Sequence, residues 1–273
     1  MTVAVVTDSS CAIPKDLAAR YNIRIVPLYL IWEGKEYADW VDIVPDEFYA
    51  RLRETETLPT TSGVVPKEFQ AVFEELRGKV DGVVAITLSP DTPSLAYWSA
   101  VMAKTLVAGL AIEVVDSRFT TTALGLVVTA AARAAAAGAS LQDVMKVARS
   151  VIPKMHMFLN AGPISHFLRI KAASRMGHND ITTMKDGRLV QFESHLSKEE
   201  ARRRLRELLY ERARKDRPLH AAVFHADAVE AAEEFKRDIA SQYQYTELWI
   251  GESSPVVAAR VLPDSLGIAF YNE

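Results

Sequence analysis

The stretch Val3-Ala4-Val5-Val6-Thr7-Asp8-Ser9-Ser10 opens the chain with an apolar run that leads directly into a polar, hydroxyl-rich turn. A short continuous run of β-branched residues is typical of a buried strand in a parallel sheet. Similar runs occur at Ile23–Leu30, Val83–Leu88 and Ile112–Val115. Because helical patterns separate these runs, the sequence predicts a parallel sheet covered by helices.

Amphipathic helices are predicted between the strands and after them. Several begin at a proline, whose missing N–H and fixed φ suit the first position of a helix. The helices predicted in this half are Pro14–Tyr21, Pro45–Arg53, Pro66–Gly78, Leu95–Ala108, Leu124–Gly138 and Leu141–Ser150. The apolar stretch Leu124–Ala137 is shorter than the ~20 residues that span a bilayer, so we expect a buried helix there.

The pattern changes after Ile152-Pro153, where a second lobe of α+β type is expected to begin. Asp186-Gly187 supplies the residues of a tight turn and predicts a hairpin between two flanking apolar segments. Ser197 and Glu200 have the spacing of a capping box at the start of a helix. The other elements expected are the hairpin strands Ile181–Met184 and Leu189–Phe192, strands at Ala221–Phe224, Leu248–Gly251 and Ile268–Tyr271, and a helix at Ala228–Ile239.

These patterns predict a two-lobed α/β protein. The first lobe, residues 1–152, is expected to be a parallel sheet with helices on both faces, carrying the polar turns that bind a head group. The second lobe, residues 153–273, is expected to be of α+β type. A chain of 273 residues is long enough for two such lobes that share an interface.

The composition is that of an ordinary globular protein, with 49% hydrophobic and 25% charged residues. A formal net charge of −3 gives no overall attraction to nucleic acid. The single cysteine, Cys11, excludes an internal disulfide framework and is interpreted as a packing residue in a reducing compartment. Met1 is followed at once by the first strand without a signal peptide, so we expect a cytoplasmic protein without stable membrane insertion.

Polar turns follow three of the predicted strands, at Thr7–Ser10, Ser89–Ser94 and Asp116–Arg118. Ligands of open parallel sheets bind beyond the carboxyl ends of the strands, so these turns are expected to border one crevice. Ser94 is predicted to cap the following helix and to place its hydroxyl beside free N–H groups, where an anion binds. Thr61-Ser62 precedes the helix at Pro66 in a similar way. Two such clusters can hold a carboxylate without a metal, although each turn alone is more typical of plain capping.

The sequence lacks a Gly-x-Gly-x-x-Gly or Walker-type loop, a Gly-x-Ser-x-Gly elbow and a His-Glu-x-x-His pattern. We therefore predict no catalytic residue, no cofactor and no metal site. Asp8 leaves one enzymatic alternative open, because an aspartate at the end of the first strand can accept a phosphoryl group in a phosphotransferase or phosphatase. Ser10 stands where a second acidic residue would support that alternative.

Two other polar features receive structural interpretations. His225 follows a predicted strand, and a lone histidine there is more often a structural group than a base or a ligand. The arginines of residues 202–214 alternate with Glu207 and Glu211, which is typical of a solvated helix face. A docking surface for a protein partner is the alternative for this helix.

The order of these motifs resembles that of the DegV family of two-lobed fatty-acid-binding proteins. The matching pieces are Val6–Ser10, Pro59–Ser62 with Pro66–Phe69, Val115–Ser117 with Leu124–Leu126, His225–Ala228, and Ser254–Val257 with Leu266–Phe270. The resemblance implies an acyl chain in a tunnel, with its carboxylate held at polar turns near the mouth. It also implies a carrier, not an enzyme, that can present the fatty acid to a separate fatty-acid kinase. Thr61, Ser62 and Ser94 match the family's head-group hydroxyls.

The chain also departs from the family pattern. Leu95-Ala96 replaces the glycine and threonine of the family's Ser-Gly-Thr-Tyr turn, and Leu168 to Arg175 only echoes its Leu…Gly-Gly-Arg stretch. Arg260-Val261-Leu262-Pro263-Asp264 replaces a His-x-Gly-Pro-Gly pattern. Arg260 is therefore expected at the tunnel mouth as counter-ion of the carboxylate, since a guanidinium grips a carboxylate through two parallel hydrogen bonds. The alternative is that Arg260 pairs with Asp264 or turns to solvent.

Overall fold

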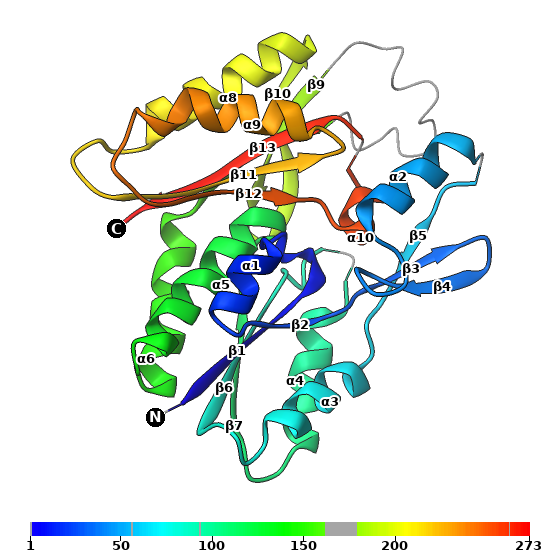
Figure 1. Cartoon of the computed structure of the whole chain (residues 1–273), viewed down its shortest axis with the longest axis vertical. Coiled ribbons are helices and arrows are strands. Elements are labelled where there is room, and N and C mark those ends of the chain that lie inside the picture. Colours follow the sequence, from blue (N-terminus) through cyan, green and yellow to red (C-terminus); the bar gives the residue numbers. More distant parts are fainter. Residues whose placement is uncertain (1, 56, 93, 162–178, 262) are drawn as a thin grey trace.

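The computed structural model describes residues 2–55, 57–92, 94–161, 179–261 and 263–273. The chain forms two lobes, one above the other in Figure 1, and each is built on its own sheet. A small third sheet, of β3, β4 and β5, projects at the side of the molecule. The two-lobed α/β architecture is the one that the sequence predicts.

The sheet of the first lobe is parallel throughout and has the strand order β2-β1-β6-β7. Every residue of β1 and β6 is buried, as expected where helices cover both faces of a parallel sheet. The strands are β1 (Val3–Asp8), β2 (Arg24–Val26), β6 (Gly82–Thr87) and β7 (Ala111–Asp116). The prediction of one continuous strand over Ile23–Leu30 was wrong, because β2 is shorter than this range. It stops at Val26, because Pro27 has no N–H to continue the ladder.

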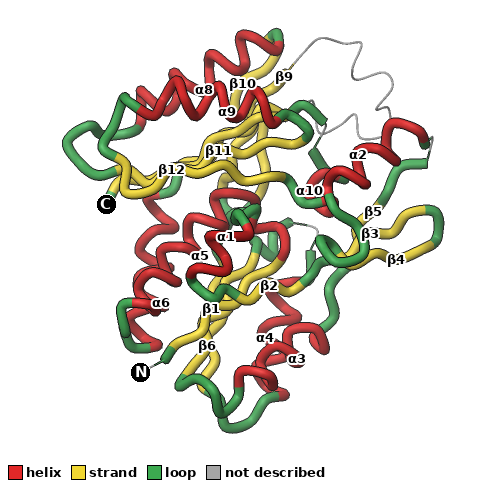
Figure 2. Tube along the Cα trace, viewed as in Figure 1, coloured by secondary structure: helices red, strands yellow, loops and turns green. Residues whose placement is uncertain are grey.

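Helices cover both faces of this sheet, as Figure 2 shows. One layer contains α3 (Pro66–Leu76) and α4 (Ala96–Leu106), which pack on each other. On the other face lie α5 (Thr121–Ala136) and α6 (Leu141–Val151). The helix α1 (Lys15–Arg20) and the 3-10 turns η1 (Ser9–Cys11) and η2 (Ile152–Lys154) complete the lobe.

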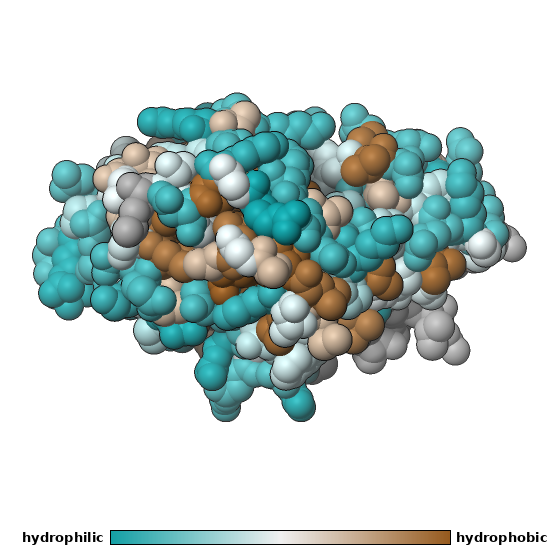
Figure 3. Space-filling view, turned by 90° about the horizontal axis from the view of Figure 1, so that it is seen from below, coloured by the Kyte–Doolittle hydropathy of each residue, from teal (hydrophilic) through white to brown (hydrophobic). Residues whose placement is uncertain are grey.

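The predicted buried helix is α5, in which Thr121 to Ala132 are all buried. Within the part of the chain that the structure describes, no helix has both the length and the apolar character to cross a membrane. Seen from below, the surface of the molecule carries a band of apolar residues across its middle (Figure 3). Exposed large apolar side chains at helical spacing occur on and just before α4, at Leu95, Trp98, Met102 and Leu106.

The second lobe contains a mixed sheet with the order β10-β9-β8-β13-β11-β12. β11 and β12 are parallel, whereas the other pairs are antiparallel. The strands are β8 (His156–Ala161), β9 (Asn179–Lys185), β10 (Arg188–Leu196), β11 (Leu219–Ala226), β12 (Tyr245–Glu252) and β13 (Ser265–Asn272). Helices α8 (Lys198–Arg212) and α9 (Val229–Ala240) cover its outer face and enclose a second core that includes Leu205 and Phe235.

Two local predictions in this lobe are confirmed. Asp186 and Gly187 have φ of 48° and 79°, the left-handed conformation that the tight turn between β9 and β10 requires. Ser197 caps α8 by accepting from the Glu200 N–H, while the Glu200 carboxylate accepts from the Ser197 N–H. Both features depend on neighbouring residues alone, which explains why the sequence reveals them.

The small sheet was not expected from the sequence. It has the order β4-β3-β5 and lies close to the helices α2 and α10. The strands of this sheet are β3 (Tyr29–Trp32), β4 (Lys35–Ala38) and β5 (Thr60–Ser62). The helices beside it are α2 (Pro45–Glu54) and α10 (Pro255–Ala258). Thr60–Ser62 is thus a strand, not a loop before a helix. Strands of three or four residues are too short for an alternating pattern to show.

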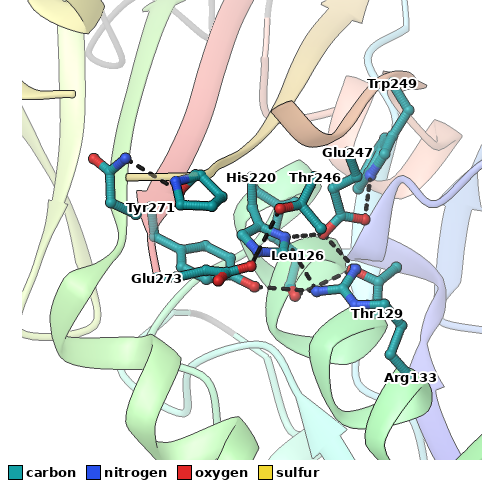
Figure 4. A network of polar contacts seen from close by, with 11 residues as sticks. Leu126, Thr129, Arg133, His220, Thr246, Glu247, Trp249, Tyr271 and Glu273 are labelled. Carbon is teal, nitrogen blue, oxygen red and sulfur yellow. Dashed lines mark hydrogen bonds and ion pairs between the residues drawn. The ribbon is translucent and has the colours of Figure 1, made fainter. Parts of the chain in front are cut away.

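The two lobes share one core and a buried polar network. Helix α5 of the first lobe packs on β11 and β13 of the second. There Arg133 of α5 donates to Glu247 and Tyr271, and its Nη2 lies 3.1 Å from Nδ1 of His220, the arrangement drawn in Figure 4. We call these four residues, with Glu273 beside His220, the Arg133 network. Because the core continues across the interface, a domain boundary at residue 152 stays a prediction.

Candidate ligand-binding site

Asp8 ends β1 with a fully buried carboxylate that ties two strands together. One oxygen accepts from the N–H and hydroxyl of Ser10, and the other accepts from the N–H of Leu88, 2.8 Å away, just after β6. Burial raises the pKa of Asp8. A carboxylate that is enclosed and fully hydrogen-bonded is a poor nucleophile, so this geometry speaks against the phosphotransferase alternative.

The tip of the β9–β10 hairpin covers the other two polar turns. A Cβ on Gly187 would lie 2.3 Å from the Ser89 hydroxyl, so only a glycine allows the hairpin to come this close. Arg188 lies 3.5 Å from Asp91, and Arg118 lies 3.9 Å from Asp186. The crevice expected beyond the carboxyl ends of the strands is therefore partly closed by the second lobe.

Thr61 and Arg260 lie against each other, although 199 residues separate them in the chain. Arg260 follows α10, and its Nη2 donates to the Thr61 hydroxyl in β5 at 2.5 Å. Asp264 does not pair with Arg260, because its carboxylate contacts Lys198 and Arg202 instead. The structure therefore brings together two of the residues that the sequence proposes for the head group.

The Ser62 side chain lies on the opposite face of β5 from the Thr61 side chain. Successive residues of a strand project to opposite faces of a sheet. The Ser62 hydroxyl accordingly donates across β3 to the carboxylate of Glu36 in β4 at 2.9 Å, whereas the Thr61 hydroxyl accepts from Arg260. One anion therefore cannot contact both hydroxyls in this arrangement.

Helix α4 begins one residue later than the sequence predicts, so that Ser94 lies one position before its N-cap. The N-cap of α4 is Leu95, whose side chain makes no capping hydrogen bond, so the prediction of Ser94 as N-cap was wrong. Its hydroxyl still accepts from the N–H of Ala96, the first residue of α4, at 3.2 Å. A Cβ on Gly63 would lie 2.6 Å from Leu95, so the Ser94 turn lies directly beside the end of β5.

Asp39 is a buried residue that the sequence analysis missed. Its carboxylate accepts from the Ser9 hydroxyl at 2.5 Å and from the N–H of Val256 in α10 at 3.2 Å. Burial raises its pKa to about 7. Asp39 thus fixes the start of α10, the short helix that precedes Arg260. No local sequence motif indicates this role.

Cys11 and His225 are both buried. Burial raises the pKa of the Cys11 thiol to about 12, which leaves it a neutral packing residue. Burial also lowers the pKa of His225, and its Nδ1 has no hydrogen-bond partner. His225 is thus neutral at physiological pH, and within the described part of the chain its Nδ1 stays without a partner, so the structural interpretation of this histidine stays a prediction.

The arginines of α8 are mostly paired with carboxylates. Arg204 contacts Glu193, Glu207 and Glu211, and Arg206 contacts Asp238. This pairing fits a solvated helix face. Among residues 2–55, 57–92, 94–161, 179–261 and 263–273, no group of three His, Cys, Asp or Glu is placed to hold a metal ion. The stretch Leu168–Arg175 and Leu262, which enter the family pattern, lie outside the described residues.

The chain is similar to known proteins over its whole length. It is 32% identical to a DegV domain-containing protein of Caldanaerobacter subterraneus, with 98% of each chain covered. It superimposes on the crystal structure of DegV, a fatty acid binding protein from Bacillus subtilis, with a TM-score of 0.90, 26% identity and 100% of both chains covered. A fatty-acid-binding DegV family protein from Thermus thermophilus has the same fold, with a TM-score of 0.88, 24% identity and 100% of both chains covered. The DegV family model matches residues 2–172 and 178–273, and the chain therefore belongs to the DegV family.

Proposed function

We propose that this protein binds a long-chain fatty acid and holds its carboxylate between Arg260 and Thr61. The observation that supports this most strongly is the contact of the Arg260 guanidinium with the Thr61 hydroxyl. Two donors that converge on one point can both bond to a carboxylate, and one of them carries the opposite charge. The relatives from Bacillus subtilis and Thermus thermophilus, which share the fold, are described as fatty-acid binders.

The head group and the chain of the ligand play different parts. Each buried methylene contributes about 0.8 kcal/mol, so a long acyl chain supplies most of the affinity. The donors at the mouth select an acid over an alcohol or an ester and orient it. Ser94, beside the end of β5, is a third donor in this proposal. Ser62 is not included, because its hydroxyl donates to Glu36.

The protein acts as a carrier in this proposal and has no enzymatic activity of its own. A carboxylate held at the mouth of a tunnel is accessible to a separate fatty-acid kinase, which would transfer a phosphoryl group from ATP to a carboxylate oxygen. The carrier contributes binding and the kinase contributes the chemistry. Such an exchange with an ATP-dependent enzyme takes place in the cytoplasm.

Mass spectrometry of lipid extracted from the denatured protein tests the proposal. We expect about one fatty acid per chain after purification from a bacterial host, because an apolar tunnel is costly to leave hydrated. Delipidated protein should regain thermal stability when a fatty acid is added, since ligands that bind the native state stabilise it. Absence of any acyl species, together with no stabilisation by fatty acids, would contradict it.

A further inference from the structure

A pocket of about 660 Å³ lies apart from the candidate site, with Asp39 among the residues that line it. This pocket is open to solvent on one side and is bordered by the segment from η1 into α1, by β2, by the loop that leads into α2, and by the end of β12. None of Thr61, Ser62, Ser94 and Arg260 lines it. Its volume is in the range of small-molecule sites, about 300–1,000 Å³.

The walls of this cavity are mainly apolar. Ile13, Ile25, Val44 and Ile250 contribute side chains from four separate segments. Ile25 and Val44 remain 38% and 37% exposed. Apolar side chains that line a concave surface and stay in contact with water favour an apolar occupant.

The rim of the cavity carries an excess of negative charge. Asp46 and Glu252 both line it, and neither has an ion pair with any residue that the structure describes. Burial, followed by the nearby Asp46 carboxylate, raises the pKa of Glu252. Two carboxylates that repel each other are stabilised by a cation placed between them.

Other charged groups around the rim offset this excess only in part. Among the described lining residues Lys15 is the only basic one. Its ammonium lies 5.0 Å from the centre of the Trp40 ring, over its face, and its charge acts to lower the pKa of Glu252. Asp227 also faces Glu252 and is already paired with Arg53 of α2. Asp39 lies in the wall, with its oxygens on Ser9 and Val256.

We propose that this cavity binds an organic ammonium ion with an apolar body, whose charge lies between Asp46 and Glu252. The apolar walls hold the hydrocarbon part of the ligand. The ligand has the opposite charge to a fatty acid and binds at a separate place. The site therefore does not depend on the fatty-acid proposal.

Calorimetric titration with n-octylammonium tests the proposal, with octanoate and ammonium chloride as controls. The titration is made on the protein as purified and again after addition of excess oleate. We expect one n-octylammonium ion per chain, bound equally well with and without oleate, whereas octanoate competes only with oleate. Binding of octanoate to the oleate-saturated protein as tightly as n-octylammonium, or displacement of n-octylammonium by oleate, would overturn the proposal.

Substitutions at Val41 locate the site without disturbing the core. Val41 lines the cavity and is 71% exposed, so charged residues are tolerated there. We expect Val41→Lys to weaken n-octylammonium binding and Val41→Glu to strengthen it, each about three- to tenfold, as for a partly solvated charge pair. Asp16→Asn, on the same helix as Lys15 but outside the cavity lining, should change nothing. Identical affinities for Val41→Lys and Val41→Glu would place the ion elsewhere and refute the proposal.

Discussion

Two arginines join distant segments of this protein, and they do so in different ways. Arg133 lies at the interface of the lobes and contacts Glu247 at 2.6 Å, with His220 and Tyr271 on its other nitrogen. Arg260 is exposed and, among the described residues, donates to the Thr61 hydroxyl. A guanidinium surrounded by protein partners holds the structure together, whereas one whose described partner is a single neutral hydroxyl has N–H groups left for a ligand.

The largest effect is expected where the Arg133 network is broken. Glu247→Ala leaves Arg133 and His220 without the carboxylate between them, where it is 12% exposed in the native protein. We expect a loss of at most about 3–5 kcal/mol in the free energy of unfolding, the range for breaking a fully buried ion pair, because Arg133 is 27% exposed. Urea denaturation measures it, and Glu211→Ala on α8, which removes an exposed pair with Arg204, should cost less than about 1 kcal/mol. Similar losses in the two variants would mean that burial does not distinguish them.

The pH dependence of stability tests Asp39, which supports the helix that leads to Arg260. Because its pKa is raised to about 7, the native state retains a proton that the unfolded chain releases near its ordinary value of 3.8. Stability should therefore fall as pH rises from about 4 to about 7, by at most about 1.4 kcal/mol per pH unit.

Asp39→Asn removes this titration while keeping groups that can bond to Ser9 and Val256. The variant should show a flatter dependence of the melting temperature on pH over that window. Thermal unfolding of both proteins between pH 4 and 8 measures the difference. Parallel curves for wild type and variant would show that Asp39 does not titrate there.

Arg260→Ala should affect binding but not folding. Loss of a charged donor costs about 1.5–3 kcal/mol in binding of a fatty acid, roughly ten- to a hundredfold in affinity. The methyl ester of the same acid should bind the variant and the wild type alike. Since arginine side chains stay charged at physiological pH, wild-type affinity should be nearly constant from about pH 6 to 8. Unchanged affinity for the free acid would refute Arg260 as the counter-ion.

Three alanine substitutions separate the hydroxyls of the candidate site. Thr61→Ala and Ser94→Ala should each weaken fatty-acid binding by about 1.5–3 kcal/mol if the site is desolvated, and affect the matching alcohol less. Ser62→Ala is the matched control, because its hydroxyl lies on Glu36 at the opposite face of β5. It should change affinity by less than about 0.5 kcal/mol. Calorimetry with acid and alcohol compares the variants, and equal losses for both ligands would indicate damaged packing.

The sequence by itself determined the features that depend on neighbouring residues. The apolar runs of β1, β6 and β7, the Asp186-Gly187 turn and the Ser197–Glu200 cap all have their cause within a few positions of the chain. The family resemblance proposed Thr61 and Arg260 as residues of one site. It could not show that they touch.

Only the tertiary structure decided how the candidate site is assembled. Arg260 reaches Thr61 because α10 is held by Asp39, which is 217 residues away from Val256. Ser62, next to Thr61, is turned away because β5 pairs with β3 in a sheet of strands too short to leave a sequence pattern. These contacts depend on long-range packing and on the burial of a carboxylate, which local periodicity does not encode.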